Sequence, residues 1–307
     1  MTHYTFKTPR HYKKSLVAYL DIIGFKKKIE KSSKSAEEAD AIYQILRTHH
    51  RTTQIINKGK DAPYIELTKL KATSFSDNIV ISLPIMNDKT FRSFIHLVTY
   101  FQWDTTDFNS FLRGAIVFGR ICHTKEVVFG PAMVHAYELE RKVSKWPRVI
   151  VDQELIDLLS EETRQFAFDY VLLRDETGLL FVDYLRYIYL TKLAEETDGT
   201  NKVPSYLTEE FVFRQHRQSI ELALNEPRLV SRVLFAFYKL STYHNDCIDR
   251  ICREFQIDGY YPTLDEESKK RHIDILQSEK INLNDAFWRY HKFLQRHMPK
   301  TPEVINP

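Results

Sequence analysis

The order of apolar segments along residues 15–152 restricts the fold of this chain more than any other feature of its sequence. Residues 15–23 are apolar and rich in β-forming types, which predicts a short buried strand. Apolar residues at helical spacing predict helices over about 35–57 and 89–111. Three further strands are expected over residues 64–75, 78–84 and 112–119. This order of strand, helix, hairpin, helix and strand predicts an α+β fold with a ferredoxin-like antiparallel sheet and helices over one face.

The rest of the chain adds smaller elements and then changes character. The smaller elements are a strand over 126–129, a helix from Gly130-Pro131 to about residue 144 and a strand over 147–152. After about residue 185, helical spacing is found in three long segments, namely residues 204–225, 227–255 and 264–298. We therefore expect two domains, residues 1–185 with the sheet and residues 186–307 as a helical C-terminal region.

Composition narrows the class of protein. Hydrophobic residues make up 43% of the 307 residues, which is enough for a core and too many for a disordered protein. The net charge of +3 does not demand a nucleic-acid partner. Cys122, Cys247 and Cys252 are too few for a disulfide framework, as is typical of a reducing cytoplasm. Because no secretory-type apolar run and no run of about 18 apolar residues is present, we expect a cytoplasmic protein without a membrane span.

Two aspartates stand where strands of the expected sheet end. Asp21 lies inside an apolar run just ahead of Gly24, and Asp77 lies in the turn of the expected hairpin. If their strands are neighbours, the two carboxylates converge. Convergent oxygen ligands suit a hard divalent cation, which commonly accompanies nucleotide phosphates. Two alternatives stay open: Asp21 as the cap of the helix that follows Gly24, and Asp77 as an ordinary turn residue.

Other groups near these strand ends have both a functional and a structural interpretation. Arg113 begins a strand, where its planar fork of donors could bind a triphosphate or form a simple salt bridge. The turn at Gly24 and Phe25 exposes backbone N–H groups that could bind phosphate. The alternative is that Phe25 is a hydrophobic residue that anchors the start of the helix. The lysines at 26–28 are interpreted as a solvated helix face. Zinc spacing, a Walker A loop, a Rossmann fingerprint and a nucleophile elbow are all missing from the sequence.

Several motifs of the first domain resemble those of one family. They are Leu20-Asp21-Ile22-Ile23-Gly24-Phe25, Phe75-Ser76-Asp77-Asn78, Arg113-Gly114-Ala115, Gly119, Gly130-Pro131-Ala132, Ala136-Tyr137-Glu138-Leu139-Glu140 and Trp146-Pro147-Arg148-Val149-Ile150-Val151. Together they resemble the class III nucleotide cyclase homology domain, and more closely the pyrimidine cyclases of the bacterial Pycsar anti-phage system. The resemblance covers roughly residues 15–152. It implies a class III cyclase-like catalytic domain and a homodimer whose active sites are composite.

The resemblance also implies a metal site. In cyclases of this homology two aspartates bind two divalent ions, commonly Mg²⁺ or Mn²⁺. By resemblance Asp21 and Asp77 take that role, with the backbone carbonyl of Ile22 as a third ligand. The reaction is attack of the ribose 3′-hydroxyl on the α-phosphate with release of diphosphate. One ion lowers the pKa of the hydroxyl, and the other steadies the triphosphate.

Two departures from the family bear on the base. Purine cyclases carry a base-reading Lys four residues before the second metal aspartate, and Thr73 stands there in this chain. Their partner Asp falls three residues before the helix-opening Gly, where this chain has Val127. The loss of both charges favours a pyrimidine, read by hydroxyl and backbone groups. Tyr43, on the first expected helix, is a further position to test for base contact.

A third departure concerns the transition state. The family carries an Asn and an Arg on the following helix that stabilise the transition state. In this chain they would fall at Val134 and Glu138, and neither side chain can take that role. Either an arginine elsewhere substitutes, with Arg113, Arg120 and Arg141 as candidates, or the activity is weak.

The sequence therefore predicts a pyrimidine nucleotide cyclase that converts UTP to 3′,5′-cyclic UMP and diphosphate, as a messenger to a separate effector in anti-phage defence. CTP is the alternative substrate, because the two bases differ at one ring position. Two other hypotheses stay open. One is a non-catalytic nucleotide-binding protein with a cyclase-like fold. The other is a nucleotidyltransferase with a similar pair of aspartates.

Overall fold

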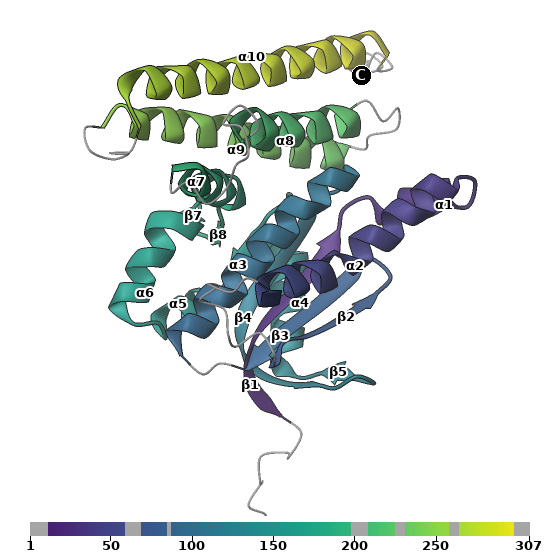
Figure 1. The fold of residues 1–307 in the computed structure, drawn as a ribbon. Coiled ribbons are helices and arrows are strands. Elements are labelled where there is room, and N and C mark those ends of the chain that lie inside the picture. The colour runs from purple at the N-terminus through teal and green to yellow at the C-terminus, as the bar shows by residue number, and fades with distance from the viewer. Residues whose placement is uncertain are drawn as a thin grey trace, which may run out of the picture. The chain divides into compact units, whose positions relative to one another are not determined.

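The computed structural model describes residues 12–58, 69–84, 87–197, 208–224, 231–257 and 264–297. The chain forms two compact units, Met1–Asn201 and Lys202–Pro307, whose elements are drawn in Figure 1. Helix α7 (Tyr184–Thr197) belongs to the first unit. The break between the two compact units thus comes later in the chain than the expected boundary at 185. The division into a catalytic domain and a helical C-terminal region at residue 185 stays a prediction.

Four antiparallel strands form the centre of the first unit. They are β1 (Lys13–Ile22), β2 (Lys71–Phe75), β3 (Asn78–Pro84) and β4 (Leu112–His123). They lie in the order β2-β3-β1-β4, and each neighbouring pair is antiparallel. Helices α1 (Phe25–Ser32) and α2 (Ala36–Lys58) connect β1 toward β2, and α3 (Asp88–Asp104) connects β3 toward β4. This arrangement confirms the predicted ferredoxin-like fold. The first part of the expected strand 64–75, residues 64–68, lies outside the described residues.

Further strands widen this sheet beyond β4. The strand β6 (Val149–Val151) pairs with β4 in parallel, and β8 (Leu180–Val182) and β7 (Leu172–Arg174) follow as antiparallel neighbours. The short β5 (Val128–Phe129) pairs with the far end of β4. The sequence did not predict β7 and β8, because segments of three residues are too short for a recognisable alternation.

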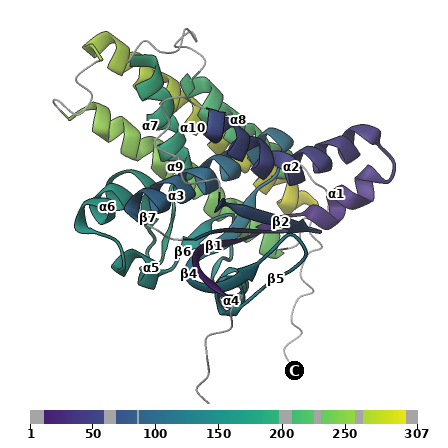
Figure 2. The same ribbon diagram turned by 60° about the horizontal axis from the view of Figure 1, so that its bottom comes forward.

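Both faces of the sheet are covered in the first unit. Every residue of β1 from Leu16 to Leu20 is buried, although neighbours in a strand point to opposite faces. Helix α4 (Pro131–Val143) packs on the face that carries Val17 and Tyr19, which meet Ala132. We expected helices over one face only, and this was wrong because helices cover both faces. Figure 2 shows α4 on one side of the sheet and α3 on the other. A Cβ on Gly119 would lie 3.0 Å from that of Ala132, so glycine lets α4 approach β4 closely.

The remaining elements complete the two units. In the first unit they are the 3-10 helix η2 (Thr105–Phe108), α5 (Gln153–Asp157), α6 (Glu161–Phe166) and the π-helical turn η3 (Ala167–Val171). The described part of the second unit consists of α8 (Thr208–Leu224), α9 (Ser231–Phe255) and α10 (Glu266–His297), which pack against one another. The predicted helical C-terminal region is confirmed. In the described ranges no helix has the length and apolar character needed to cross a membrane. All three cysteines are free and buried.

Candidate active site

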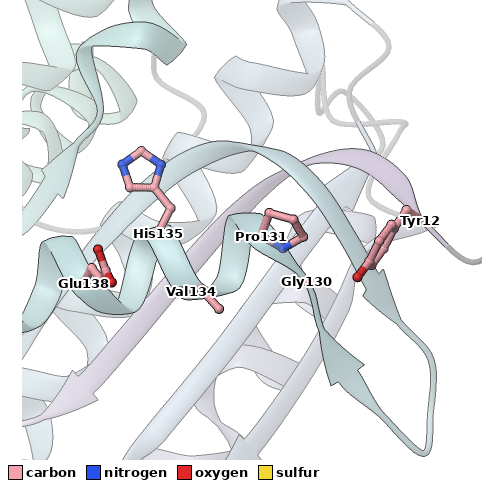
Figure 3. A pocket seen from close by; sticks show the side chains of 6 residues that line it. All are labelled: Tyr12, Gly130, Pro131, Val134, His135 and Glu138. Carbon is pink, nitrogen blue, oxygen red and sulfur yellow. The ribbon is translucent and has the colours of Figure 1, made fainter. Parts of the chain in front are cut away.

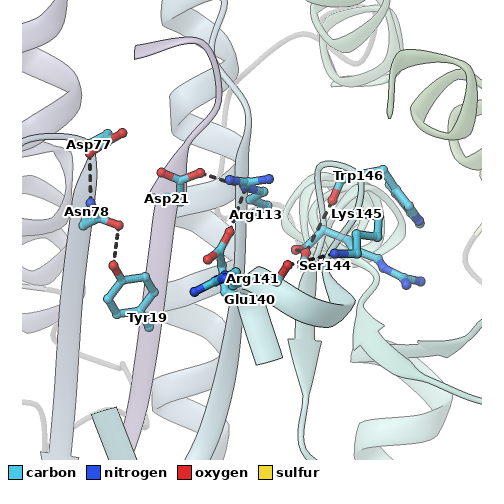
Figure 4. Close-up of polar contacts among 11 residues, drawn as sticks. Tyr19, Asp21, Asp77, Asn78, Arg113, Glu140, Arg141, Ser144, Lys145 and Trp146 are labelled. Atoms are coloured by element: carbon cyan, nitrogen blue, oxygen red, sulfur yellow. Dashed lines mark hydrogen bonds and ion pairs between the residues drawn. The ribbon is translucent and has the colours of Figure 1, made fainter. Parts of the chain in front are cut away.

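The pairing of β1 with β3 brings Asp21 and Asp77 to the same end of two neighbouring strands. Asp21 is in register with Asn78, and the N–H of Ile22 donates to the carbonyl oxygen of Asp77 at 2.9 Å. Asp77 follows Ser76, whose φ of 57° makes the tight turn between β2 and β3. Figure 4 shows the two aspartates at this end of the sheet. The condition that their strands are neighbours is therefore met, and the role of the two aspartates in metal binding stays a prediction.

Arg113 lies on the other side of Asp21, because β4 is the second neighbour of β1. The two residues are in register, and Nε of Arg113 donates to Oδ2 of Asp21 at 2.7 Å. The side chain of Asp21 is 13% exposed. Burial raises the pKa of Asp21, Arg113 opposes that rise, and the negative charge of Asp77 adds to it. The ion-pair interpretation of Arg113 is thus confirmed, and its role toward a triphosphate is untested.

A third carboxylate, Glu140 of α4, joins this cluster without having been assigned a role from the sequence. Its Oε1 lies 2.8 Å from the same Nε of Arg113, and its side chain is 5% exposed. Burial raises the pKa of Glu140, Arg113 opposes the rise, and Asp21 adds to it. Glu140 follows Ala132 and Ala136 at intervals of four, which places all three on the helix stripe that faces the sheet. That spacing is the signal that could have identified Glu140.

A chain of hydrogen bonds holds the carboxylate of Asp77. The hydroxyl of Tyr19 donates to Oδ1 of Asn78 at 2.5 Å, and Nδ2 of Asn78 donates to Oδ1 of Asp77 at 2.9 Å. Burial, followed by the charges of Glu140 and Asp21, raises the pKa of Tyr19 to about 12. The phenol therefore stays protonated and can act as the donor in this chain (Figure 4).

Thr73 belongs to a separate polar cluster on β2, β3 and β4. Its hydroxyl lies 2.9 Å from Nε2 of His123, and the hydroxyl of Ser82 lies 2.8 Å from Nδ1 of the same ring. Lys71 donates to the backbone carbonyl of His123. Burial, with the nearby charge of Lys71, lowers the pKa of His123 to about 4. No role was predicted for His123, because its partners come from two other strands and lie about 40 or 50 residues away in the sequence.

The Gly24 turn matches its prediction. Gly24 has a φ of 78° and starts α1, with its carbonyl accepting from the N–H groups of Lys27 and Lys28. Phe25 is buried, so it anchors the helix start. Tyr43 is 54% exposed on α2, and its hydroxyl accepts from Arg47 at 3.1 Å. A contact of any of these residues with nucleotide stays a prediction.

Val134 and Glu138, which occupy the positions of the family's transition-state Asn and Arg, lie on the outer face of α4. Val134 is 57% exposed, and Glu138 forms an exposed ion pair with Lys142 at 3.1 Å. Both residues line a shallow groove of about 580 Å³ together with the Gly130-Pro131 helix start (Figure 3). They are thus available to a neighbouring molecule and not part of the Arg113 cluster.

The three candidate arginines differ in their surroundings. Arg120 and Arg141 are exposed, whereas Arg113 contacts the buried carboxylates directly. Val127, at the second base-reading position, is also exposed. A role of any of these arginines toward phosphate stays a prediction.

The residues at these strand ends suit a divalent cation in type. Asp21 and Asp77 supply hard oxygen ligands, and the rise that Asp77 causes in the pKa of Asp21 reflects a repulsion that a cation would relieve. Among the described residues, no group of three His, Cys, Asp or Glu side chains gathers to hold an ion. A cation would therefore depend on the two aspartates together with backbone oxygen such as that of Ile22.

Comparison with known proteins gives weak similarities. No protein-family model matches the sequence, and no curated protein matches it at a significant level. The adenylyl cyclase CyaB from P. aeruginosa is similar with a TM-score of 0.39 and 13% identity, over 56% of this chain and 93% of that one. A bacterial light-regulated adenylyl cyclase gives a TM-score of 0.34 and 11% identity, over 60% of this chain and 98% of its own. Because similarities of this size support no conclusion about activity, function has to be inferred from the site residues.

Proposed function

We propose that this chain is a pyrimidine nucleotide cyclase that converts UTP to 3′,5′-cyclic UMP and diphosphate. The observation that carries the proposal is the strand pairing that sets Asp21 beside Asp77 on one side and beside Arg113 on the other. Two carboxylates and a guanidinium at one sheet end form a site for a metal-bound triphosphate. The proposed role in anti-phage defence and the cytoplasmic location rest on the motif resemblance.

The metal-binding residues of this proposal are Asp21, Asp77 and the carbonyl of Ile22. Mn²⁺ or Mg²⁺ bound there would supply Lewis acidity toward the 3′-hydroxyl and charge neutralisation of the triphosphate. The chain itself binds and orients the substrate. Arg113 offers several N–H donors to phosphate oxygens, and the backbone at the Gly24 turn leads into the start of α1.

The preference for a pyrimidine is supported by uncharged residues at the two base-reading positions. Thr73 offers a hydroxyl, and Val127 offers no polar group. A hydroxyl can donate or accept, so it can read either uracil or cytosine. We choose UTP as the substrate and keep CTP as the alternative, with Tyr43 as a further candidate for base contact.

A homodimer with composite sites belongs to the same proposal. Large apolar side chains are exposed at Val127, just before β5, at Phe129 in β5, and at Val134 and Tyr137 on α4. Exposed apolar patches of this kind often mark protein interfaces. A second copy seated there would cover the outer face of α4, where Val134 and Glu138 stand at the positions of the family's transition-state pair. Gel filtration at several concentrations tests this part, and a fully active strict monomer would contradict it.

A non-catalytic nucleotide-binding role is the second candidate, and one observation favours it. Arg113 forms ion pairs with both Asp21 and Glu140 of the same chain. A site closed by its own arginine could bind nucleotide without turning it over.

Product analysis separates these candidates. Purified protein is incubated with each nucleoside triphosphate and Mn²⁺, and the products are identified by mass spectrometry. Cyclic UMP is the expected product. Cyclic CMP would move the preference to cytosine, binding without turnover would support the second candidate, and linear or oligomeric products would indicate a nucleotidyltransferase.

Conservative variants test the metal residues. We expect Asp21→Asn and Asp77→Asn each to lower turnover by roughly a thousandfold or more, because each removes a charged ligand while keeping the side-chain size. Asp274→Asn is the matched control, since it makes the same change at an exposed position of α10. Full activity in either site variant would remove that residue from the mechanism.

A further inference from the structure

One nitrogen of Arg113 is shared between two carboxylates. Its Nε lies 2.7 Å from Oδ2 of Asp21 and 2.8 Å from Oε1 of Glu140 (Figure 4). The N–H of this nitrogen points at Asp21 and forms its hydrogen bond with Oδ2 of that residue. Within the described residues, the buried Oε1 of Glu140 has charge attraction to Arg113 but accepts no hydrogen bond. Glu140 is therefore an acceptor placed at hydrogen-bond distance whose hydrogen bond has not been made.

The two carboxylates differ in what else they can bind. Asp21 stands at the strand end beside Asp77, and 13% of its side chain is exposed. Glu140 is held on α4 with 5% of its side chain exposed, and the nearest positive charges acting on it are Arg113 and Lys145. Arg113 itself is 39% exposed, so its guanidinium has room to move. A buried carboxylate holds on to a cationic partner because an unpaired buried charge is costly.

We infer that Glu140 is a positioning residue that receives the guanidinium of Arg113 when a divalent cation binds Asp21. The inference deepens the proposed function and rests on it, because it requires the cation at Asp21. A cation and the guanidinium would both be attracted to the carboxylate of Asp21, so we expect a bound cation to weaken the hydrogen bond that Arg113 donates to Oδ2. Oε1 of Glu140 is already 2.8 Å from the same nitrogen, so a small rotation transfers the hydrogen bond.

Such a transfer lets one arginine serve two states of the site. In one state Arg113 is paired with Asp21 and partly offsets the repulsion between Asp21 and Asp77. With metal, Glu140 holds Nε while the outer nitrogens of the guanidinium remain as donors toward phosphate. Glu140 thus lowers the cost of replacing the arginine with the metal, without itself touching metal or substrate.

Direct Mn²⁺ binding tests this without nucleotide or turnover. The free Mn²⁺ signal in room-temperature electron paramagnetic resonance gives the Kd for the wild type, Glu140→Gln, Arg113→Met and the double variant. We expect Glu140→Gln to raise the Kd about tenfold, the size of one charge-assisted hydrogen bond. In the Arg113→Met background, where no arginine needs a new partner, we expect Glu140→Gln to change the Kd by less than about threefold.

The conservative variant Glu140→Asp separates position from charge. It keeps the negative charge but withdraws the carboxylate by one methylene, so we expect a Kd between those of the wild type and Glu140→Gln. A purely electrostatic role would leave its Kd unchanged. Circular dichroism and thermal unfolding check the fold of each variant, and Glu140→Asp provides the test where Glu140→Gln does not fold.

The outcomes separate this inference from the proposed function. The role of Glu140 is overturned if Glu140→Gln has equal effects on the Kd in both backgrounds, or if Glu140→Asp leaves the Kd unchanged. In either case, Mn²⁺ binding by the wild type that is lost in Asp21→Asn still supports the metal site. Wild-type protein that binds no Mn²⁺ overturns both. A tenfold effect confined to the background that retains Arg113 supports the transfer.

Discussion

Gly114 tests how closely β1 and β4 approach each other beside the site. A Cβ on Gly114 would lie 2.3 Å from the carbonyl oxygen of Tyr19 and 2.7 Å from Cδ2 of Leu20. The oxygen belongs to the backbone and cannot rotate away, so β1 has to shift until that spacing reaches at least 3.0 Å. We expect Gly114→Ala to lower the free energy of unfolding by about 3 kcal/mol, the upper end of the usual range for overpacking.

The same shift should disturb the site. Asp21 follows Tyr19 and Leu20 on β1, so its carboxylate moves relative to Arg113 and Asp77. We expect the melting temperature of the first unit to fall by roughly 6–12 °C. UTP turnover by the folded protein should fall by at least about tenfold, because small misplacements of catalytic groups are costly. Thermal unfolding and product assays on one preparation measure both.

Gly119→Ala is the matched control. Its new Cβ would lie 3.0 Å from the Cβ of Ala132, a side chain on a helix that can adjust by a few tenths of an ångström. We expect a loss of no more than about 1 kcal/mol in this variant. If Gly114→Ala also stays within about 1 kcal/mol of the wild type, the two strands separate easily and the reasoning about their close approach is refuted.

Three further substitutions probe the polar groups on the α4 side of the sheet. The folded protein lowers the pKa of His123 from 6.5 to about 4. Between pH 6.5 and about pH 4 the unfolded chain therefore binds a proton at His123 that the folded protein does not, so the free energy of unfolding falls as the pH drops through this range. Denaturant titrations from pH 7 to 4.5 should show a smaller fall in His123→Gln, and parallel curves would contradict this. Tyr19→Phe removes the hydrogen bond to Asn78 and should cost about 1 kcal/mol in urea unfolding, and no loss would mean that the bond contributes nothing. Thr73→Val removes the hydroxyl that faces His123 and should raise the KM for UTP by about fivefold or more with little change in kcat, whereas an unchanged KM would remove Thr73 from base reading.

The central fold could be predicted because its segments carry clear periodic patterns. Residues 15–23 form an apolar run bounded by a glycine turn, and the observed β1 differs from it by one or two residues at each end. The helices of the second unit, with amphipathic spacing over 17 to 32 residues, were predicted to within about four residues at their ends. Long patterns average over many side chains, so single exceptions do not hide them.

The partners within the site could be predicted only in part. The pair Asp21 and Asp77 follows from strand order, because hairpin and sheet topology decide which strand ends meet. The contact of Arg113 with Glu140 depends on where α4 crosses the sheet, and His123 depends on the register of three strands. Such contacts join residues that no local pattern connects. The helical spacing from Ala136 to Glu140 marked the residue but not its partner.

The register of β1 connects the stability of the core with the geometry of the site. Val17, Tyr19 and Asp21 alternate with Leu16, Ala18 and Leu20, so a slip of one residue would exchange the two faces of the strand. Asp21 would then leave both Asn78 and Arg113, and its carboxylate would be buried on the opposite face. Because the packing of β1 against both covered faces of the sheet opposes any slip, the apolar residues of β1 hold the carboxylate in place. Changes to that core should therefore alter the site even where they touch none of its polar groups.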